Sequence, residues 1–326
     1  MSIIETMTCD ARARAAQWPS QVGVQWTQRS RGAPGRLNFG ELMSKPHADG
    51  LEALAGLMGL RGIVALTGAG CSTESGIPDY RGPKTRKKAR NPIKIDAFLG
   101  QAQSRQRYWA RSTAGWPRMR EAAPNAAHRS LARLEASGHL AGLVTQNVDG
   151  LHQRAGSDRV IELHGALSRV RCLGCGKIEP RDGLHDRLLR ANPGRRAGAA
   201  QLAPDGDVDL VGSTRDFETL GCLKCGGVLK PDVVFFGENV PRDVHDASSA
   251  LMEEARGLLI VGSSLAVYSG YRFLLSAEKR RLPVGMINLG PPHRGSELVQ
   301  IHVDGKAGEL LPALAQILGV SDDESL

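Results

Sequence analysis

The sequence predicts an α/β protein with a doubly wound parallel sheet and a smaller inserted domain. Short apolar runs of strand length alternate with longer stretches of helical periodicity along most of the chain, a pattern typical of parallel sheets covered by helices. Two segments, residues 85–123 and 166–227, depart from that alternation. At 326 residues and 41% hydrophobic content, the chain is long enough for one large domain and one smaller module.

The first strand is predicted at residues 63–66, where an Ile-Val-Ala-Leu run follows an amphipathic stretch at 49–60 and precedes a glycine turn. Four similar apolar runs, each closed by polar or glycine residues, predict further strands, and helical patterns lie between them. The strands are expected at 142–145, 258–261, 284–287 and 299–301, and the helices at 124–137, 244–256 and 270–281. Residues 105–111 also have a helical pattern.

The domain boundaries follow from these elements. Residues 1–45 lack clean periodicity and contain Gly32, Pro34 and Gly35, so we expect them to form a poorly ordered extension. The large domain is expected at 46–84, 124–165 and 228–318, the smaller one as a helical module at 85–123 with a cysteine-containing module at 166–227, and a tail at 319–326.

Composition narrows the class of protein. The net charge of +8 could indicate a nucleic-acid partner, but the basic run at 84–90 lacks the interleaved aromatic residues of a base-stacking surface, so we do not expect one. The most apolar stretch, residues 51–66, contains Glu52 and Arg61, so we expect no membrane span. The N-terminus lacks a secretory signal pattern. A cytoplasmic location is therefore expected, with the mitochondrial matrix as the alternative.

Four of the six cysteines form two CxxC pairs, Cys172/Cys175 and Cys222/Cys225. In a chain that otherwise has the features of an intracellular protein, this spacing favours a metal site over disulfides. Four thiolates suit tetrahedral Zn²⁺ and leave no position open for water, so the predicted ion is one structural zinc.

A glycine-rich turn, Gly68-Ala69-Gly70, follows the first predicted strand. Glycines at such a place let backbone N–H groups approach a pyrophosphate closely. However, the spacing departs from GxGxxG, and a basic run at 87–90 stands where a dehydrogenase would carry an acidic residue for the ribose. A hydride-transferring enzyme is therefore disfavoured.

Two further polar motifs follow strand-like runs. Residues 145–152, Thr-Gln-Asn-Val-Asp-Gly-Leu-His, stand where open α/β sheets place ligands. Asn147 and Asp149 could pair with a carboxamide there, or simply cap a turn. His164, in the Glu-Leu-His-Gly run at 162–165, precedes the cysteine module. A neutral imidazole with a pKa near the working pH suits general-base chemistry.

The glycine turn continues into Gly-Ile-Pro-Asp-Tyr-Arg-Gly at residues 76–82, and together they closely resemble the signature of the sirtuins, a GAGxS loop followed by a GIPDFR-like segment. The resemblance extends over about residues 50–318. Cys71 stands where the family usually has Ala, Ile or Val. Within the family the chain looks nearest to the class II branch that includes the fourth mammalian sirtuin, on segments 105–111, 115–117, 203–208 and 267–273.

This resemblance implies a Rossmann-like NAD-binding domain beside a small zinc-binding and helical domain. It implies NAD-dependent removal of acyl groups from protein lysines, with nicotinamide and O-acyl-ADP-ribose as products. His164 would deprotonate a ribose hydroxyl, and Asn147 and Asp149 would hold the nicotinamide. Acyl-lysine peptides would bind by strand addition to a protein that we expect to be a monomer. Two alternatives stay open, namely mono-ADP-ribosyl transfer to protein and a non-catalytic zinc-dependent interaction module.

The resemblance also assigns contacts residue by residue. The implied NAD contacts are Gly68, Ala69, Gly70, Ser72, Thr73, Glu74, Pro78, Asp79, Tyr80, Arg81, Gln146, Asn147, Asp149, Gly262, Ser263, Ser264, Asn288, Leu289, Gly290 and Ala307. The implied substrate contacts are Tyr108, Arg111, Val234, Phe236, Gly237 and Glu238.

Tyr108 and Arg111 stand at i and i+3 on a predicted helix, so they share a face. A tyrosine hydroxyl and a guanidinium together can bind a terminal carboxylate, the arginine through a bidentate charged pair. The pair resembles the Tyr-x-x-Arg with which some sirtuins select succinyl, malonyl or glutaryl lysine. We therefore expect acidic acyl groups to be preferred over acetyl, although class II relatives are associated with bulkier ones.

Overall fold

The computed structural model describes residues 45–80, 92–194, 203–208 and 213–320. All of them belong to one compact unit, Phe39–Leu326. The extension expected at 1–45, except the backbone of its last residue, lies outside the described residues, as do Arg81 and the basic run at 84–90. Within the described part, no helix has both the length and the apolar character needed to cross a membrane.

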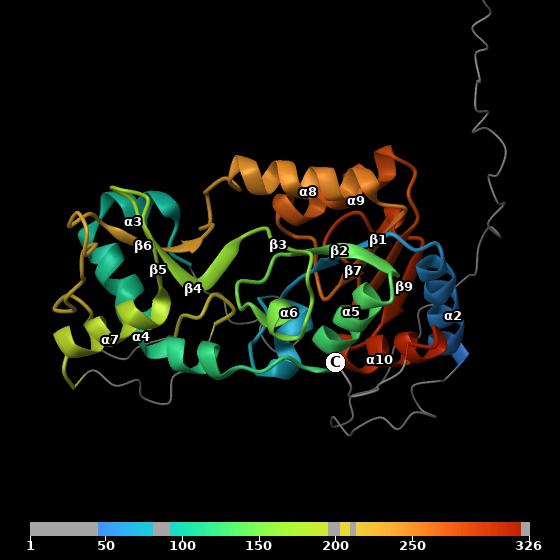
Figure 1. Ribbon diagram of the computed structural model, residues 1–326, viewed down its shortest axis with the longest axis horizontal. Coiled ribbons are helices and arrows are strands. Elements are labelled where there is room, and N and C mark those ends of the chain that lie inside the picture. Colours follow the sequence, from blue (N-terminus) through green and yellow to red (C-terminus); the bar gives the residue numbers. More distant parts are fainter. Residues whose placement is uncertain (1–44, 81–91, 195–202, 209–212, 321–326) are drawn as a thin grey trace, which may run out of the picture. The chain divides into compact units, whose positions relative to one another are not determined.

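A six-stranded parallel sheet forms the larger part of the fold (Figure 1). Its strands are β1 (Ile63–Thr67), β2 (Leu140–Thr145), β3 (Val160–Glu162), β7 (Gly257–Val261), β8 (Val284–Asn288) and β9 (Ile301–Asp304). They lie in the order β3-β2-β1-β7-β8-β9, and every pair is parallel. The chain therefore winds outward in both directions from β1, and the order reverses between β1 and β7, where doubly wound sheets bind ligands.

Helices cover both faces of this sheet, as Figure 1 shows. The helices are α2 (Lys45–Gly59), α5 (Ala126–Ala136), α6 (Leu151–Arg154) and α10 (Ala307–Ile317), with α8 (Arg242–Glu254) and α9 (Tyr268–Lys279). Ile63 and Ala65 of β1 pack in one core cluster with α2, α5 and α10, whereas Val64 and Leu66 pack in the other with α8 and α9. Since both faces are buried, β1 is apolar at consecutive positions.

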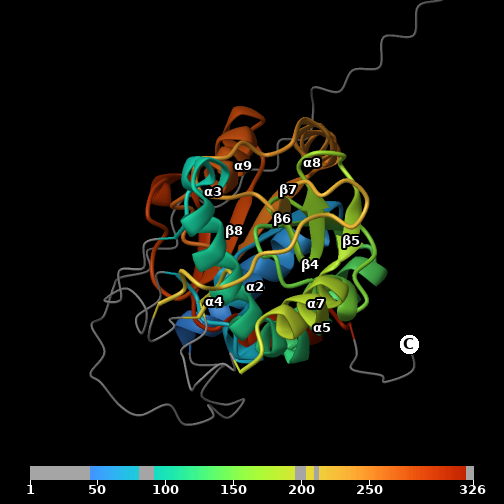
Figure 2. The same cartoon turned by 90° about the vertical axis from the view of Figure 1, so that its left-hand side faces the viewer.

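A second, three-stranded antiparallel sheet lies in the smaller part, which faces the viewer in Figure 2. It contains β4 (Gly165–Cys172), β5 (Ile178–Pro180) and β6 (Leu229–Val233), and packs with α3 (Ile95–Gly100), α4 (Ala102–Glu121) and α7 (Arg181–Ala191). Arg181 is 1% exposed. Its guanidinium lies 5.3 Å from the ring centre of Trp109 and 5.4 Å from that of Trp116. These cation–π contacts join α7 to α4.

The elements differ from the sequence expectations at several ends. The last strand, expected at 299–301, is β9 at Ile301–Asp304, and the helix expected to start at residue 49 begins at Lys45. Residues 105–111 are the middle of the longer α4. The sequence places 228–318 in the large domain, whereas β6, at the start of that range, pairs with β4 in the small sheet. The domain limits themselves stay predictions.

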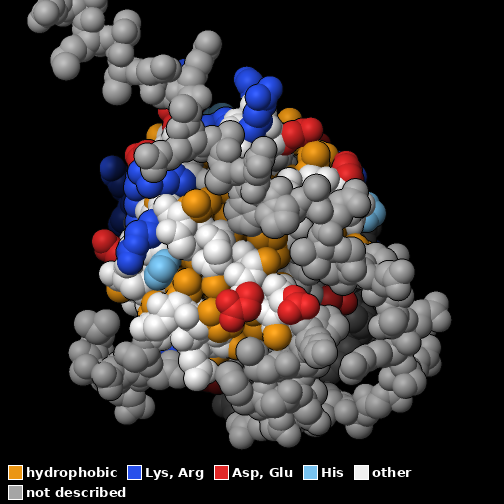
Figure 3. All heavy atoms as spheres, turned by 90° about the vertical axis from the view of Figure 1, so that its right-hand side faces the viewer, with side chains coloured by type: hydrophobic (Ala, Val, Ile, Leu, Met, Phe, Trp, Pro, Cys, Tyr) orange, Lys and Arg blue, Asp and Glu red, His pale blue; other side chains and the backbone are white. Residues whose placement is uncertain are grey.

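The charge of the chain does not make its surface uniformly basic. On the face shown in Figure 3, Lys and Arg side chains gather toward one side, while acidic, hydrophobic and uncharged groups occupy much of the remaining described surface. The described part of this face therefore offers no continuous basic surface of the kind that binds a nucleic-acid backbone.

Candidate active site

A cavity of about 1670 Å³ opens at the carboxyl ends of the parallel strands. Turns after β1, β2, β7 and β8 line it from the large sheet, and residues from Val233 to Val240 line it from the end of β6. Typical small-molecule sites measure about 300–1,000 Å³. The space is therefore large enough for more than one reactant, and both sheets contribute to its wall.

The turn after β1 requires glycine because two backbone segments meet there. Gly68 N donates to Val261 O at 3.0 Å, and Gly70 N donates to Gly262 O at 2.8 Å. A Cβ on Gly68 would stand 2.8 Å from Gly262 O, and one on Gly70 2.8 Å from Gly262 Cα. Side chains would force apart the turns after β1 and β7, so this pair of turns leaves backbone exposed to a ligand such as a pyrophosphate.

Asn147 and Asp149 lie against this turn rather than simply capping a loop. Asn147 Nδ2 donates to Gly68 O at 3.1 Å and to Ser72 Oγ at 3.0 Å. Ser72 Oγ donates to Asp149 Oδ2 at 2.7 Å, and Asp149 Oδ1 accepts from Leu151 N at 2.9 Å. Burial raises the pKa of Asp149, while these two hydrogen bonds oppose the rise. The network fixes an amide and a carboxyl group on the cavity wall.

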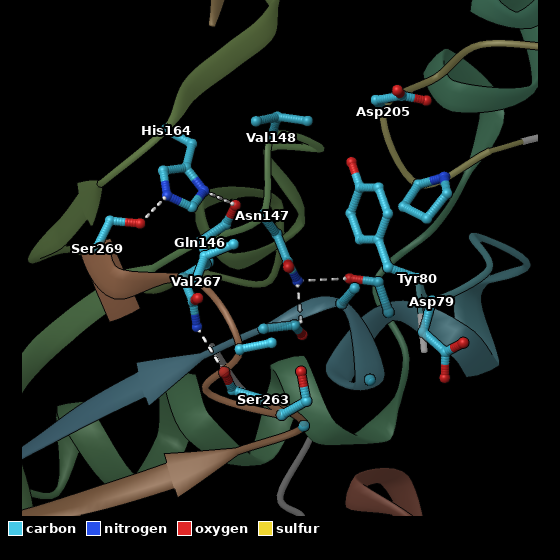
Figure 4. A pocket seen from close by; sticks show the side chains of 18 of the residues that line it. Asp79, Tyr80, Gln146, Asn147, Val148, His164, Asp205, Ser263, Val267 and Ser269 are labelled. Carbon is cyan, nitrogen blue, oxygen red and sulfur yellow. Dashed lines mark hydrogen bonds between the residues drawn. The ribbon is translucent and has the colours of Figure 1, made fainter. Parts of the chain in front are cut away.

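His164 is held at both ring nitrogens, as Figure 4 shows. Nδ1 lies 2.8 Å from Gln146 O, and because a carbonyl only accepts, Nδ1 carries the proton. Nε2 is therefore free of hydrogen in the neutral ring and accepts from Ser269 Oγ at 2.8 Å. Burial lowers the pKa of His164, with the Gln146 carbonyl partly opposing that effect. The result is a neutral imidazole whose basic nitrogen lies in the cavity wall.

Most residues that the sequence assigned to NAD line this one cavity. Those that do are Gly68, Ala69, Gly70, Ser72, Thr73, Pro78, Asp79, Tyr80, Gln146, Asn147, Asp149, Gly262, Ser263, Ser264, Asn288, Leu289, Gly290 and Ala307. Glu74 does not: its Oε2 instead accepts from Gly308 N at 2.8 Å, in the first turn of α10. Arg81 lies outside the described residues.

The segment assigned to the substrate peptide follows β6. Val234, Phe236, Gly237 and Glu238 all line the cavity, and Val234 N donates to His164 O at 2.9 Å. Glu238 has partners within the chain, since Oε2 lies 2.9 Å from Lys230 Nζ and accepts from the backbone N of Phe235, three residues earlier, at 2.8 Å. Glu238 therefore fixes the conformation of the segment after β6. Phe236, by contrast, is 38% exposed and thus accessible to a ligand.

Of the predicted pair on α4, the structure places Tyr108 but not Arg111 in the cavity wall. Tyr108 lines the cavity, is 5% exposed and stacks edge-on with Phe98. Arg111 is not part of the lining; its Nε donates to Val208 O at 3.0 Å and lies 3.4 Å from Asp207 Oδ2. Asp207, which does line the cavity, is thus the ion-pair partner through which Arg111 adjoins the cavity wall.

The four paired cysteines converge as a zinc site requires. Their sulfurs lie within 4.8 Å of one another. Cys172 Sγ lies 3.4 Å from Cys225 Sγ, and Cys175 Sγ lies 3.8 Å from Cys222 Sγ. Zn–S bonds of about 2.3 Å in a tetrahedron place sulfurs about 3.8 Å apart. The donor set therefore fits a closed structural zinc site.

Sequence reasoning missed two features of this region. Ser269 belongs to a segment noted only for its family resemblance, and nothing in its local sequence indicates that it contacts His164. Cys71, His128 and His152 form a buried cluster beside the glycine turn. Burial raises the pKa of the Cys71 thiol and lowers the pKa of His128 to about 4 and of His152 to about 3. A metal-ligand search of the sequence could not join residues so far apart.

Comparison with known proteins gives consistent matches. Residues 68–269 match the model of the Sir2 family. A protein of Mycobacterium avium named NAD-dependent protein deacetylase 1 is 47% identical over 281 residues, covering 85% of this chain and 98% of that protein. The human mitochondrial NAD-dependent protein lipoamidase sirtuin-4 is 49% identical, covering 77% of this chain and 81% of its own. A solved complex of Sir2 with a p53 peptide and NAD+ aligns with a TM-score of 0.66 at 30% identity, over 83% of this chain and 99% of that one.

Proposed function

Because the chain belongs to the Sir2 family, we propose that it removes acyl groups from protein lysine side chains and consumes NAD+ in the reaction. The observation that carries the proposal is the placement of His164. Its hydrogen-free Nε2 lies in the wall of a cavity that also contains the glycine turns, Asn147 and Asp149. Relatives named as NAD-dependent deacetylases, and a related structure that holds both a peptide and NAD+, support this reading.

The residues divide between binding and proton transfer. In the turns at 68–72 and 262–264, N–H groups that are not used in the contact between the turns, such as those of Ser263 and Ser264, are offered to the phosphates of NAD+. Asn147 and Asp149 offer an amide and a carboxyl group to the carboxamide of nicotinamide. In this proposal the acyl oxygen bonds to the ribose carbon as nicotinamide leaves, which gives an alkylimidate. His164 Nε2 then accepts a proton from a ribose hydroxyl, whose oxygen attacks the imidate carbon, and addition of one water releases lysine. The products are free lysine, nicotinamide and O-acyl-ADP-ribose.

His164→Ala should remove nearly all turnover without unfolding the protein, since among the described residues the ring hydrogen-bonds with one carbonyl and one hydroxyl. Removing a general base typically costs about 10²–10⁴-fold in rate. The measurement is nicotinamide release from a panel of acyl-lysine peptides, with circular dichroism to check the fold. Lys279→Ala, which removes an exposed side chain at the end of α9 that does not line the cavity, serves as the control and should retain the wild-type rate.

Wild-type turnover in His164→Ala would contradict the assignment. NAD+ labelled on its adenosine distinguishes deacylation from ADP-ribosyl transfer. Label in O-acyl-ADP-ribose supports the proposal, and label attached to protein contradicts it. A non-catalytic module would release no nicotinamide with any peptide. The monomeric state and the cellular location stay predictions.

For the acyl group, we propose that Arg111 favours acyl chains ending in a carboxylate and that Asp207 limits this preference. The Asp207 carboxylate lies 3.4 Å from Arg111 Nε, so an acidic acyl group must compete with it for the guanidinium. Arg111→Met should then erase any preference for glutaryl-lysine over acetyl-lysine, since a buried carboxylate that loses a charged partner forfeits about 2–5 kcal/mol. Asp207→Asn should instead increase the preference, by releasing Arg111. The readout is the ratio of kcat/KM for the two peptides, and an equal ratio in wild type and both variants would refute the proposal.

A further inference from the structure

A second cluster of metal-ligand types lies outside the four-cysteine site. Cys71 of the 3₁₀ turn η1 (Ala69–Ser75), His128 of α5 and His152 of α6 each offer one ligand atom, and these atoms lie within 4.8 Å of one another. The three side chains are between 0% and 1% exposed. The rings of His128 and His152 have centres 4.8 Å apart. The cluster therefore connects η1, α5 and α6 at a buried position beside the large sheet.

Each imidazole has an oxygen partner at one nitrogen. His152 Nε2 lies 2.8 Å from Thr67 Oγ1, and because Thr67 donates its own proton to Thr145 Oγ1 at 2.8 Å, Nε2 is the donor. His128 Nδ1 accepts from the backbone N–H of Asn125 at 3.3 Å, in a capping box, and lies 3.0 Å from Asn125 Oδ1. Because a backbone N–H only donates, Nδ1 is the acceptor and Nε2 carries the proton of the neutral His128 ring.

One ring nitrogen of the cluster is left with an unused lone pair. His152 Nδ1 is buried and has no hydrogen-bond partner among the described residues. His128 Nε2 lies 3.4 Å from Ser72 Oγ, whose own proton goes to Asp149 at 2.7 Å, so this nitrogen has only a long contact. Leaving a buried nitrogen without a donor costs free energy. An orphaned lone pair beside a thiol and a second imidazole therefore indicates a missing partner that accepts electron pairs.

We propose that Cys71, His128 and His152 form a second metal site, for one thiolate- and imidazole-binding cation such as Zn²⁺ or Cu⁺. One sulfur and two imidazole nitrogens are donors that these ions accept. Histidines that ligate metals almost always donate their other N–H to an oxygen, as His152 does to Thr67. His128 would do the same to Asn125 Oδ1, 3.0 Å away, once a metal at Nε2 moved the ring proton to Nδ1. Binding forms a bond between Cys71 Sγ and the metal and releases the thiol proton to solvent.

This site is independent of the structural zinc and of the proposed activity. The four-cysteine site involves β4 and the segment before β6, whereas this cluster lies under the glycine turn. Cys71 is followed by Ser72, whose hydroxyl contacts Asn147 and Asp149, so an ion there would be one residue from the cavity wall. Because the ligands are buried, the ion enters as the chain folds.

The test is to produce the full chain in medium containing ¹¹³Cd²⁺, count the bound metal and record ¹¹³Cd NMR spectra. Wild type should hold two ions per chain and give two resonances, one from four thiolates and one, upfield of it, from one thiolate and two imidazoles. Cys71→Ala should lose the second ion and its resonance while keeping the first. Cys71→Ser, which keeps the side-chain volume, should lose it as well.

Cys9→Ala provides a matched control, because it removes the remaining cysteine outside both sets of ligands. It should leave two ions bound. One ion per chain in wild type would overturn the proposal, and so would two ions in Cys71→Ala or Cys71→Ser. Neither readout requires enzymatic turnover, so failure of the metal site and failure of the deacylase proposal are distinguishable.

Discussion

At the scale of single residues, the surroundings of His164 determine at which pH it can act as a base. Burial lowers its pKa from the usual 6.5, and the ring accepts a proton only in its neutral form. The acid limb of kcat/KM should therefore have its midpoint below pH 6.5, so that more than half of the maximal kcat/KM remains at that pH. Measuring kcat/KM against pH with one acyl peptide checks this, and circular dichroism over the same range controls for unfolding. A midpoint above pH 6.5 would contradict it.

The sequence was informative about residues where function depends on a local motif. His164, Asn147 and the glycine turn were predicted from contiguous segments, and the structure gathers them around one cavity. It was uninformative where function depends on contacts between distant segments. The pairing of Arg111 with Asp207 and the contact between Ser269 and His164 join positions that no local pattern relates.

At the scale of secondary structure, burial explains which elements the sequence could locate. The buried strands β1, β7 and β8 are apolar on both faces and were placed within one residue at each end. The edge strand β9 is only partly buried, so its apolar pattern is weaker and its position was shifted. β6 was not predicted because its Lys-Pro-Asp sequence lacks an apolar pattern. Lys230 can be buried there because it pairs with Glu238, which lies outside the strand.

Helix α5 shows an element whose start the sequence marks clearly. Asn125 accepts from Ala127 N at 2.9 Å and His128 N at 3.3 Å, a side-chain cap of the first turn. Its Nδ2 also donates to Cys71 O at 2.8 Å. The same residue that begins the helix therefore fixes the turn after β1, which is how a local signal positions part of the cavity.

At the scale of the whole molecule, the cavity depends on both sheets. The six-stranded sheet supplies the turns after β1 and β7, and the small sheet supplies the opposite wall, because β4 begins at Gly165, directly after His164, and β6 ends at Val233. Gly165 has a φ of +75°, and a Cβ there would stand 2.0 Å from Asp232 O. The two strands therefore meet closely at the residue that follows the proposed base.

Loss of the structural zinc should for this reason abolish activity while leaving the large sheet folded. Cys175 is exposed, so Cys175→Ala removes a ligand with little loss of packing, and metal binding by thiolates is coupled to folding. Hydrogen exchange should become faster for the amides of β4 and β6 and stay slow for those of β1 and β7, and nicotinamide release should fall with zinc content. Leu173→Ala changes an exposed neighbour in the same segment and should retain both zinc and turnover. Full activity in Cys175→Ala protein that lacks this zinc would show that the small sheet holds its wall of the cavity without the ion.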